Sequence, residues 1–292
     1  MKRWLVLLAA CGSSRPIASP SGAGSGSASR APELVEPGVV SSPYVEIRLA
    51  TSPDGATRLW GSTDRPGGPK GWNIWMSRRT GDAWSDPVAV SFNSDANDFD
   101  PAYSHDGRFV YFFSNRPGGV GGDDIYRVQV TGDGFGAVEH LGPEINTPGD
   151  EWAPAPSPDG SSLMFASNEP GKKHDLYVAK ITGTSFAKAE LLPGAINTPD
   201  HDEFDATFLA DGTSIVFSRS SDVENDPIEL FIARRGASGY DAGTALASVN
   251  VAGGATLGPS ISVSEPGVLY FSSKRTDASA GKLDIYRIRS IK

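Results

Sequence analysis

The sequence predicts an all-β protein, a five-bladed β-propeller of four-stranded antiparallel blades, and three observations lead to this prediction. The 292 residues include 34 glycines and 22 prolines, which indicates many turns, and no long stretch places apolar residues at helical spacing. A tight-turn signal recurs about every 52 residues, with its glycine at Gly55, Gly107, Gly160, Gly212 and Gly267. Each turn is followed by strands that would form one small sheet, and such a sheet alone leaves both of its faces uncovered. We therefore expect the five copies to stack around an axis.

Each repeat has the residues that a four-stranded meander needs. The clearest turn is Ser157-Pro158-Asp159-Gly160, where Pro presets φ, Asp caps its own turn and Gly accepts a positive φ. An alternating apolar strand follows, such as residues 109–113, and a Gly-rich loop leads to a third strand that begins with Asp124-Ile125-Tyr126 or its equivalent. A fourth strand, such as residues 190–192, is followed by Ile-Asn-Thr-Pro at 145–148 and 196–199.

The two ends of the propeller region are expected to complete the ring together. The last repeat supplies three strands, near residues 256–262, 267–272 and 284–289, and lacks a fourth. Residues 32–40 resemble the fourth-strand segment at 189–196. We expect this N-terminal segment to pair with Asp284–Arg289 as the outer strand of the fifth blade, because that pairing satisfies backbone groups at both ends.

These motifs resemble the TolB-type, WD40-like (PD40) propeller repeat of exported bacterial proteins. In the repeats at Asp106 and Asp159, the order Ile-Asn-Thr-Pro, acid-aromatic, Ser-Pro-Asp-Gly, Phe-x-Ser-Asn-Arg and Asp-Ile-Tyr follows that repeat closely. The resemblance covers about residues 32–292, which we assign to the propeller domain. It implies the fold and says little about activity, because this architecture carries many functions.

The first eleven residues predict export and a lipid anchor. Lys2 and Arg3 precede a short apolar run, and Leu8-Ala9-Ala10-Cys11 resembles the lipobox of bacterial lipoproteins. The resemblance implies a signal peptide at residues 1–10 and lipidation of Cys11, the single cysteine of the chain. Residues 11–31 are rich in Ser, Gly, Ala and Pro, which is typical of a flexible tether. We expect a lipid-anchored protein of the bacterial cell envelope, at the periplasmic side of the outer membrane or the cell surface.

Charge and composition limit the classes of ligand that we expect the protein to bind. The formal net charge is −9, which disfavours nucleic acid and anionic membrane surfaces as direct ligands. No apolar run is long enough to span a membrane, so the lipid is the expected membrane contact. No cofactor motif and no metal-ligand spacing is present. We expect a monomer that binds an envelope protein or a glycan.

Two sets of acids recur at fixed repeat positions near the predicted mouth of the central channel. The first set, the acid ring, stands nine residues before each of the first four turn glycines, and the fifth repeat has Thr256 instead. Its members are Glu46, Asp98, Glu151 and Glu203. A second set opens the third strands and includes Asp124, Asp175 and Asp284, and the loops before it carry Arg65, Arg116, Arg219 and Arg275. Both sets should lie on one face, because the loops that carry them emerge on the same side of a meander blade.

Two interpretations of these acids remain open. In the first, they bond to loop arginines and backbone N–H groups and lock the blades together, with Asp124, Asp175, Asp284, Arg116 and Arg275 as structural residues. In the second, they form an acidic funnel that binds a cation, a basic peptide or a sugar. Trp72 lies in a loop where it would stack on a sugar or peptide. The candidate ligand-binding residues are Glu46, Asp98, Asp100, Glu151, Trp152, Glu203 and Asp205.

The sequence favours a scaffold or binding protein over an enzyme. The acids are equivalent by repeat, whereas catalytic acids need unlike environments to separate their pKa values. The alternative is a five-bladed glycoside hydrolase or carbohydrate-binding protein that uses carboxylates around the central channel, such as Asp98, Asp100, Glu151, Glu203 and Asp205.

Overall fold

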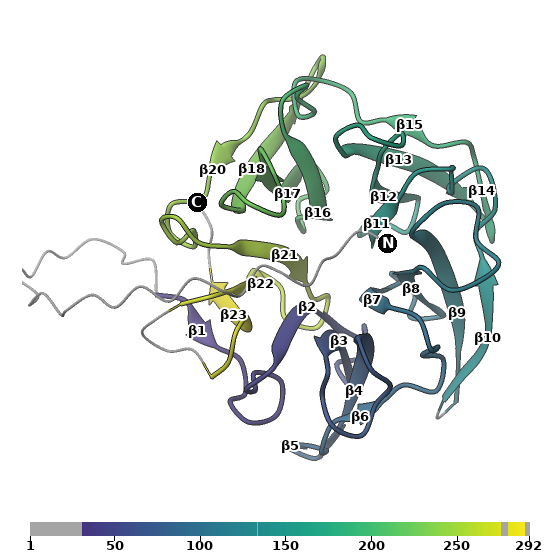
Figure 1. The fold of residues 1–292 in the computed structure, drawn as a ribbon, viewed down its shortest axis with the longest axis vertical. Helices are drawn as coiled ribbons and strands as arrows, with labels where there is room; N and C mark the ends of the chain where they lie inside the picture. The colour runs from purple at the N-terminus through teal and green to yellow at the C-terminus, as the bar shows by residue number, and fades with distance from the viewer. Residues whose placement is uncertain (1–30, 133, 276–279, 290–292) are drawn as a thin grey trace, which may run out of the picture.

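The computed structural model describes residues 31–132, 134–275 and 280–289, which form 23 β-strands and no helix. The strands are arranged in five antiparallel sheets around a common axis (Figure 1), as the repeats predict. The predicted signal peptide, Cys11 and nearly all of the tether lie outside the described residues. Among the described residues, no helix is long and apolar enough to cross a membrane.

The blades are consecutive along the chain, and each is a meander. Blade 1 contains β2 (Val45–Thr51), β3 (Thr57–Thr63), β4 (Trp72–Thr80), β5 (Ala83–Trp84) and β6 (Val88–Ala89). Blade 2 contains β7 (Asp98–Tyr103), β8 (Phe109–Ser114), β9 (Asp124–Thr131) and β10 (Gly134–His140). Blade 3 contains β11 (Glu151–Pro156), β12 (Ser162–Ser167), β13 (Asp175–Thr182), β14 (Ser185–Phe186) and β15 (Glu190–Leu191). Blade 4 contains β16 (Asp202–Phe208), β17 (Ser214–Ser220), β18 (Glu229–Gly236), β19 (Gly239–Tyr240) and β20 (Thr244–Ala245).

The fifth blade is closed by the N-terminal strand, which confirms the predicted ring closure. It contains β21 (Thr256–Ile261), β22 (Val268–Ser273), β23 (Asp284–Arg289) and β1 (Glu33–Leu34). β1 is antiparallel to β23, with Glu33 opposite Arg287 and Leu34 opposite Tyr286. The backbone N–H of Val35 and the hydroxyl of Ser41 extend the junction, because both donate to the carbonyl of Ile285.

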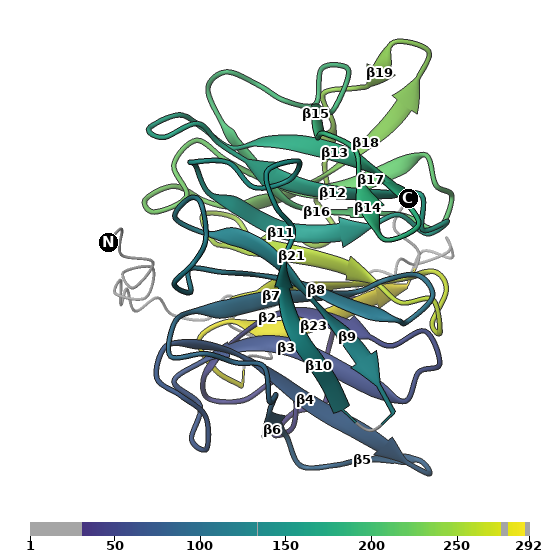
Figure 2. The ribbon, with the colours of Figure 1, turned by 90° about the vertical axis from the view of Figure 1, so that its right-hand side faces the viewer.

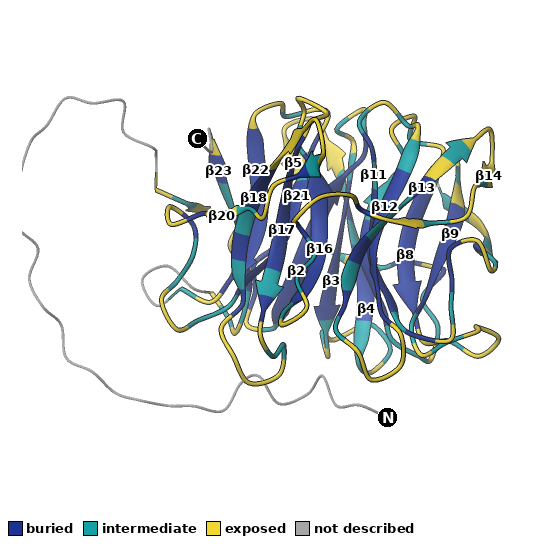
Figure 3. Cartoon of the chain, turned by 90° about the horizontal axis from the view of Figure 1, so that it is seen from above, coloured by how far each residue is buried: buried dark blue, intermediate teal, exposed yellow. Residues whose placement is uncertain are grey.

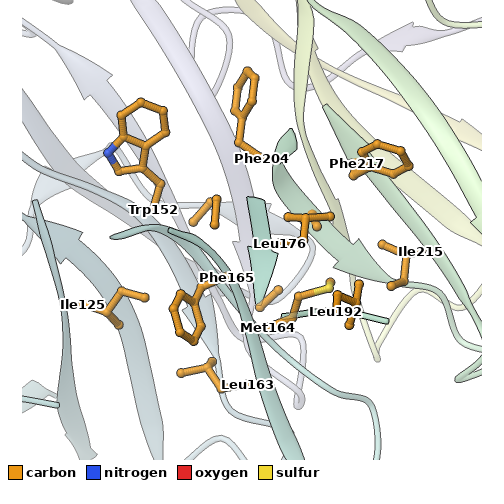
Figure 4. Packing of buried hydrophobic residues seen from close by; sticks show 14 of the residues in the cluster. Ile125, Trp152, Leu163, Met164, Phe165, Leu176, Leu192, Phe204, Ile215 and Phe217 are labelled. Atoms are coloured by element: carbon orange, nitrogen blue, oxygen red, sulfur yellow. The ribbon is translucent and has the colours of Figure 1, made fainter. Parts of the chain in front are cut away.

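The apolar residues lie between neighbouring blades, where each sheet covers the bare face of the next. In Figure 3 the strands are dark blue along most of their length and the exposed residues gather in the loops. Figure 4 shows the cluster at blade 3, where Trp152, Phe165 and Leu176 lie among side chains of blades 2 and 4. Burial of a large apolar side chain contributes about 1.5–3 kcal/mol, so these contacts hold the ring together.

An asparagine, which in two blades belongs to the Ile-Asn-Thr-Pro motif, ties each of the four connections between blades 1 and 5 to the third strand of the preceding blade. Asn146 accepts from the N–H of Ile125 at 2.7 Å and donates to the carbonyl of the same residue at 3.0 Å. Equivalent paired bonds join Asn93 to Ile74, Asn197 to Leu176 and Asn250 to Leu230. The repeat therefore keeps an asparagine because its amide satisfies both backbone groups of one strand residue.

The innermost strands are β2, β7, β11, β16 and β21, which surround the axis in Figure 1. The view from the side in Figure 2 shows the strands of all five blades running roughly across the thickness of the ring. We call the face at which the innermost strands begin the mouth face. The loops between blades and the loops between second and third strands lie on it.

Candidate ligand site at the centre of the ring

The acid ring lies at the start of the innermost strands and is fully buried. Its four acids, and Thr256 in the fifth blade, have an exposed fraction of 0%. Each acid accepts from the backbone N–H and the hydroxyl of a Ser or Thr in the segment that enters its strand. The donors are Ser42, Ser94, Thr147 and Thr198. The acid ring therefore faces backbone and hydroxyl groups between blades, where it is screened from solvent.

The loop arginines contact the segments between blades in two ways. These arginines are Arg65, Arg116, Arg219 and Arg275. Arg116 pairs with Asp98, and Arg219 pairs with Glu203 at 2.7 Å. All four arginines also donate to a backbone carbonyl of an inter-blade segment; the acceptors are Val39, Phe92, Ile196 and Val249. No arginine pairs with Glu46 or Glu151 among the described residues, and burial raises the pKa of both to about 7.

These two glutamates should make the fold more stable in mild acid than at neutral pH. Between the unfolded pKa of 4.5 and the folded value of about 7, the folded state binds more protons than the unfolded state. The free energy of unfolding should therefore fall as the pH rises through this window. Each unit of pKa difference between the folded and unfolded states corresponds to about 1.4 kcal/mol. Each glutamate therefore lowers the free energy of unfolding by up to a few kcal/mol as the pH rises through this window.

Thermal melts across the pH range test this expectation. The melting temperature should be highest near about pH 4.5 and lower at pH 8. Exposed aspartates set the acid limit. Hydrogen bonds from Ser157 and Ser161 lower the pKa of Asp159 to about 2, so the protein loses the stability that this group contributes only in stronger acid. Glu151→Gln cannot ionise, so its melting temperature should fall less between pH 5 and 8 than that of the parent. A melting temperature that rises with pH over this interval would contradict the assignment.

The second set of acids orders the loops of the mouth face. Asp124 accepts from the N–H of Val120 at 3.0 Å, and Asp284 accepts from the N–H of Ala280 at 2.9 Å. Asp175 is half-buried, and burial raises its pKa. Arg275 lies over the ring of Tyr286, with its guanidinium carbon 5.6 Å from the ring centre.

A second ring of residues lies two positions after the acid ring, at a β-bulge in every innermost strand. The pairing with the second strand shifts register at this point in all five blades. The five residues at the bulge all have φ between 47° and 60°, in the left-handed region. They are Arg48, Asp100, Ala153, Asp205 and Gly258, and we call them the inner ring. A bulge re-aims a side chain, and the contacts of Arg48 and of the two aspartates extend across the axis.

Arg48 and two aspartates of the inner ring meet at the centre of the propeller. The Nη2 of Arg48, from blade 1, donates to the carbonyls of Pro154 in blade 3 and Ala206 in blade 4, both at 3.2 Å. The carboxyl groups of Asp100 and Asp205 lie within contact of each other, and the Oδ2 of Asp205 accepts from the N–H of Gly258 at 3.1 Å. All three charged side chains belong to residues that are at most 4% exposed.

Burial raises the pKa of both aspartates, and that of Asp100 is raised further by the neighbouring charge of Asp205. The positive charge of Arg48 acts in the opposite direction on both. A carboxyl group that keeps its proton at neutral pH donates a hydrogen bond, as a general acid does. The two aspartates at the centre differ from the acid ring in their contact with each other and in the nearby charge of Arg48.

A small cavity adjoins this cluster, and we call it the central recess. It is lined by Ile47, Trp72, Phe99, Asp100, Phe113, Trp152 and Asp205. The volume open to the centre of a water molecule is about 20 Å³, which is enough for one small polar group. Trp72, which stacks on Phe99 at 5.5 Å, is the only lining residue that is not buried, so a ligand entering from the mouth face passes its ring.

One carboxylate oxygen of a residue that lines the central recess has no hydrogen-bond partner among the described residues. The Oδ1 of Asp100 is buried and accepts no bond from any described residue. Most buried polar atoms in proteins are bonded, and leaving one unbonded costs about 1–3 kcal/mol. A ligand or water molecule that donates a hydrogen bond in the recess would recover this cost.

A second tryptophan of the recess, Trp152, is held in place by polar neighbours. The ring of Trp152 stacks on His174 at 3.6 Å, and its Nε1 donates to Asp123 at 3.0 Å. His174 contacts Asp202 through Nδ1 at 3.1 Å. These bonds hold the indole in one orientation, so it forms a rigid apolar wall.

A larger cleft lies between blades 2 and 3 at the end of the ring opposite the mouth face. It has a volume of about 180 Å³ and is lined by residues that include His105, Arg108 and Arg127. Arg108 pairs with Asp106, and Arg127 pairs with Glu139 at 2.7 Å. Both arginines of this cleft already have carboxylate partners, whereas the central recess has an unpaired carboxylate oxygen. The central recess is therefore the stronger candidate for a ligand site. No group of three or more His, Cys, Asp or Glu side chains in the described ranges is placed to hold a metal ion.

The structure separates the residues that the sequence offered together as ligand-binding candidates. Asp100, Trp152 and Asp205 line the central recess, whereas Glu46, Asp98, Glu151 and Glu203 do not. The sequence interpretation missed Arg48 and His174. The signal for Arg48 was its position two residues after Glu46, the same offset that separates Asp100 from Asp98 and Asp205 from Glu203.

Comparisons with known proteins support the fold. No family model matches the chain. An uncharacterized protein of Agrobacterium fabrum is 39% identical over 67 residues, which are 23% of this chain and 20% of that protein. TolB of Acinetobacter baumannii has a TM-score of 0.52 at 14% identity; the match covers 85% of this chain and 55% of TolB, so the chain spans about half of that protein. A protein of Agrobacterium tumefaciens described as TolB also has a TM-score of 0.52, at 18% identity, over 85% of this chain and 84% of its own.

One neighbour corrects the expectation that the chain is not an enzyme. An α-L-arabinofuranosidase of Lactobacillus brevis has a TM-score of 0.54 at 10% identity, and the match covers 85% of this chain and 90% of the enzyme. An enzyme therefore has the same fold. The physical argument was also wrong, because it treated all the acids as equivalent. The inner ring places Arg, Asp, Ala, Asp and Gly at one repeat position, so Asp100 and Asp205 have environments that no other blade repeats. In its fold, this chain is a TolB-like five-bladed β-propeller.

Proposed function

We propose that this protein is an exported component of the bacterial cell envelope that binds the hydroxyl-bearing end of a glycan in the central recess. The observation that carries the proposal is the unpaired Oδ1 of Asp100 in a recess walled by aromatic rings. Sugars present hydroxyl donors beside apolar C–H faces, and aromatic rings with a few placed polar groups are the usual complement. The small volume of the recess suits one hydroxyl or hydroxymethyl group, with the rest of the glycan over Trp72.

The proposed location rests on the N-terminal sequence. Leu8-Ala9-Ala10-Cys11 fits a lipoprotein processing site, and the following Ser/Gly-rich residues fit a tether. A lipid at Cys11 would leave the propeller free to reach glycans or glycan-bearing partners of the envelope. The chain would act as a monomer, since the recess is built within one ring.

Binding is tested by titrating the purified protein with a panel of neutral oligosaccharides. Trp72 and Trp152 line the recess, so ligand should change tryptophan fluorescence, and calorimetry gives the affinity. Trp72→Ala should weaken binding about tenfold, because an aromatic contact of this kind contributes about 1–1.5 kcal/mol. Reducing ends released in the same mixtures would show whether hydrolysis accompanies binding.

The matched control is Trp84→Ala, which removes a half-buried tryptophan on the outer strand β5 of the same blade. It should bind the panel as the parent does. If no neutral oligosaccharide binds, or if both tryptophan variants lose affinity equally, the recess is not the glycan site.

A further inference from the structure

We propose that Asp100 and Asp205 hold one shared proton at neutral pH, and that this proton makes the central recess electrically neutral, so that it selects uncharged hydroxyl ligands over ammonium groups. This inference rests on the proposed function for the identity of the ligand. The shared proton itself is a property of the protein and does not depend on any ligand.

The first argument is the contact between the two carboxyl groups. Two ionised carboxylates only accept hydrogen bonds and repel each other, so the contact of Asp100 and Asp205, both buried and lining one recess, favours a proton held between them. One hydrogen bond favours Asp205 as the ionised partner. Asp205 accepts from the N–H of Gly258, which suits an ionised carboxylate. Asp100 is then the protonated partner, and it donates to Asp205.

The second argument is the balance of charge around the pair. Asp100, on β7, faces Asp205 on β16 and Arg48 on β2. Asp205 faces the same two groups and also His174, which precedes β13. Arg48 supplies one positive charge for two carboxyl groups. With one proton on the pair, one negative and one positive charge remain, and the buried cluster is neutral.

The third argument is the orientation that the proton gives to Asp100. When Asp100 donates through one oxygen, its other oxygen is a carbonyl-type acceptor. The unpaired Oδ1 of Asp100 fits that acceptor, and Asp100 lines the central recess. A hydroxyl group donates a hydrogen bond to this oxygen and brings no charge into the recess. An ammonium group would be buried in a neutral, largely aromatic recess without a counter-ion, which is strongly unfavourable. Burial, which raises the pKa of both aspartates, acts in the same direction.

The proton is tested without any ligand by ¹³C NMR of the full protein labelled at the aspartate carboxyl carbons. One aspartic acid should remain protonated at pH 7, and its resonance should be absent from Asp100→Asn. Asp98→Asn is the matched control, because it changes a buried aspartate of the acid ring that does not line the recess. The resonance should persist in that variant. If every aspartate of the parent is ionised at pH 7, the shared proton does not exist.

The selectivity is tested with a neutral oligosaccharide that binds in the panel and with its amino-sugar counterpart of the same length. The neutral ligand should bind at least about tenfold more tightly at pH 7, a difference of about 1.4 kcal/mol. Its affinity should fall with rising pH once the pair loses its proton, by up to about tenfold per pH unit. Asp100→Asn keeps an amide donor toward Asp205 and a carbonyl toward the ligand at every pH, so its affinity should be independent of pH over this range.

The outcomes separate the two proposals. A protonated aspartate without glycan binding would overturn the proposed function and, with it, the selectivity, while the proton assignment would stand. Glycan binding without a protonated aspartate would leave the proposed function and overturn this inference. Tighter binding of the amino sugar would show that the recess is negatively charged and would also overturn the inference.

Discussion

Arg48→Met should destabilise the propeller by about 3–5 kcal/mol, the usual cost of removing one partner from a buried group of charges. The substitution leaves Asp100 and Asp205 without their positive neighbour and removes the bonds to the carbonyls of Pro154 and Ala206. Urea denaturation at pH 7 measures the loss. Arg108→Met is the control, since Arg108 pairs with Asp106 with a side chain that is 63% exposed. It should cost less than about 1 kcal/mol.

A triple variant identifies the cause of the loss. Combining Arg48→Met with Asp100→Leu and Asp205→Leu removes all three charges, and apolar replacement of a buried charged group is often neutral or stabilising. The triple variant should therefore recover much of the stability that Arg48→Met loses. If it is less stable than the single variant, the loss arises from packing and the isolated carboxyl groups are not its cause.

Deletion of residues 12–41 should lower the melting temperature by about 10–20 °C or abolish cooperative unfolding. The deletion removes β1 together with Val35 and Val40, which pack against Trp60, Trp75 and other residues of blades 1 and 5. Burial of two valines contributes about 3–6 kcal/mol, and for a domain of this size each kcal/mol corresponds to about 2–4 °C. It also leaves β23 as an open edge.

Deletion of residues 12–28 is the control for this experiment, and it should leave the melting temperature unchanged. The two deletions differ only in the segment that contains β1 and the residues that join it to blade 1. If the longer deletion melts at the temperature of the parent, the closure through β1 contributes nothing to stability.

The fold could be predicted because its signals are local and repeated. The turn glycines recur five times about 52 residues apart and fix the blades, and the Ile-Asn-Thr-Pro segments at 145–148 and 196–199 specify the connections between blades. Closure was also predictable, since residues 32–40 read as a fourth strand and the last repeat lacks one.

The central site was only partly predictable, because its residues meet through the ring and have no common motif. Arg48 and Asp205 belong to blades 1 and 4, and their side chains converge only because a bulge lies at the same point in each innermost strand. A regular strand would have placed these residues by simple alternation. The sequence showed the carboxylates but not the register shift that separates the inner ring from the acid ring.

The closure through β1 has a consequence for how the chain folds. Blades 2, 3 and 4 are built from neighbouring segments and are joined by short-range contacts, whereas the bond from Arg287 to Glu33 spans 254 positions of sequence. Contacts of such long range form slowly, because the loop entropy must be lost before they are made. Blades 2, 3 and 4 are thus free to form from their own segments, whereas blade 5 forms only when both of its contributing segments are present. We therefore expect the pairing of β1 with β23 to be a late step of folding, the one that closes the ring.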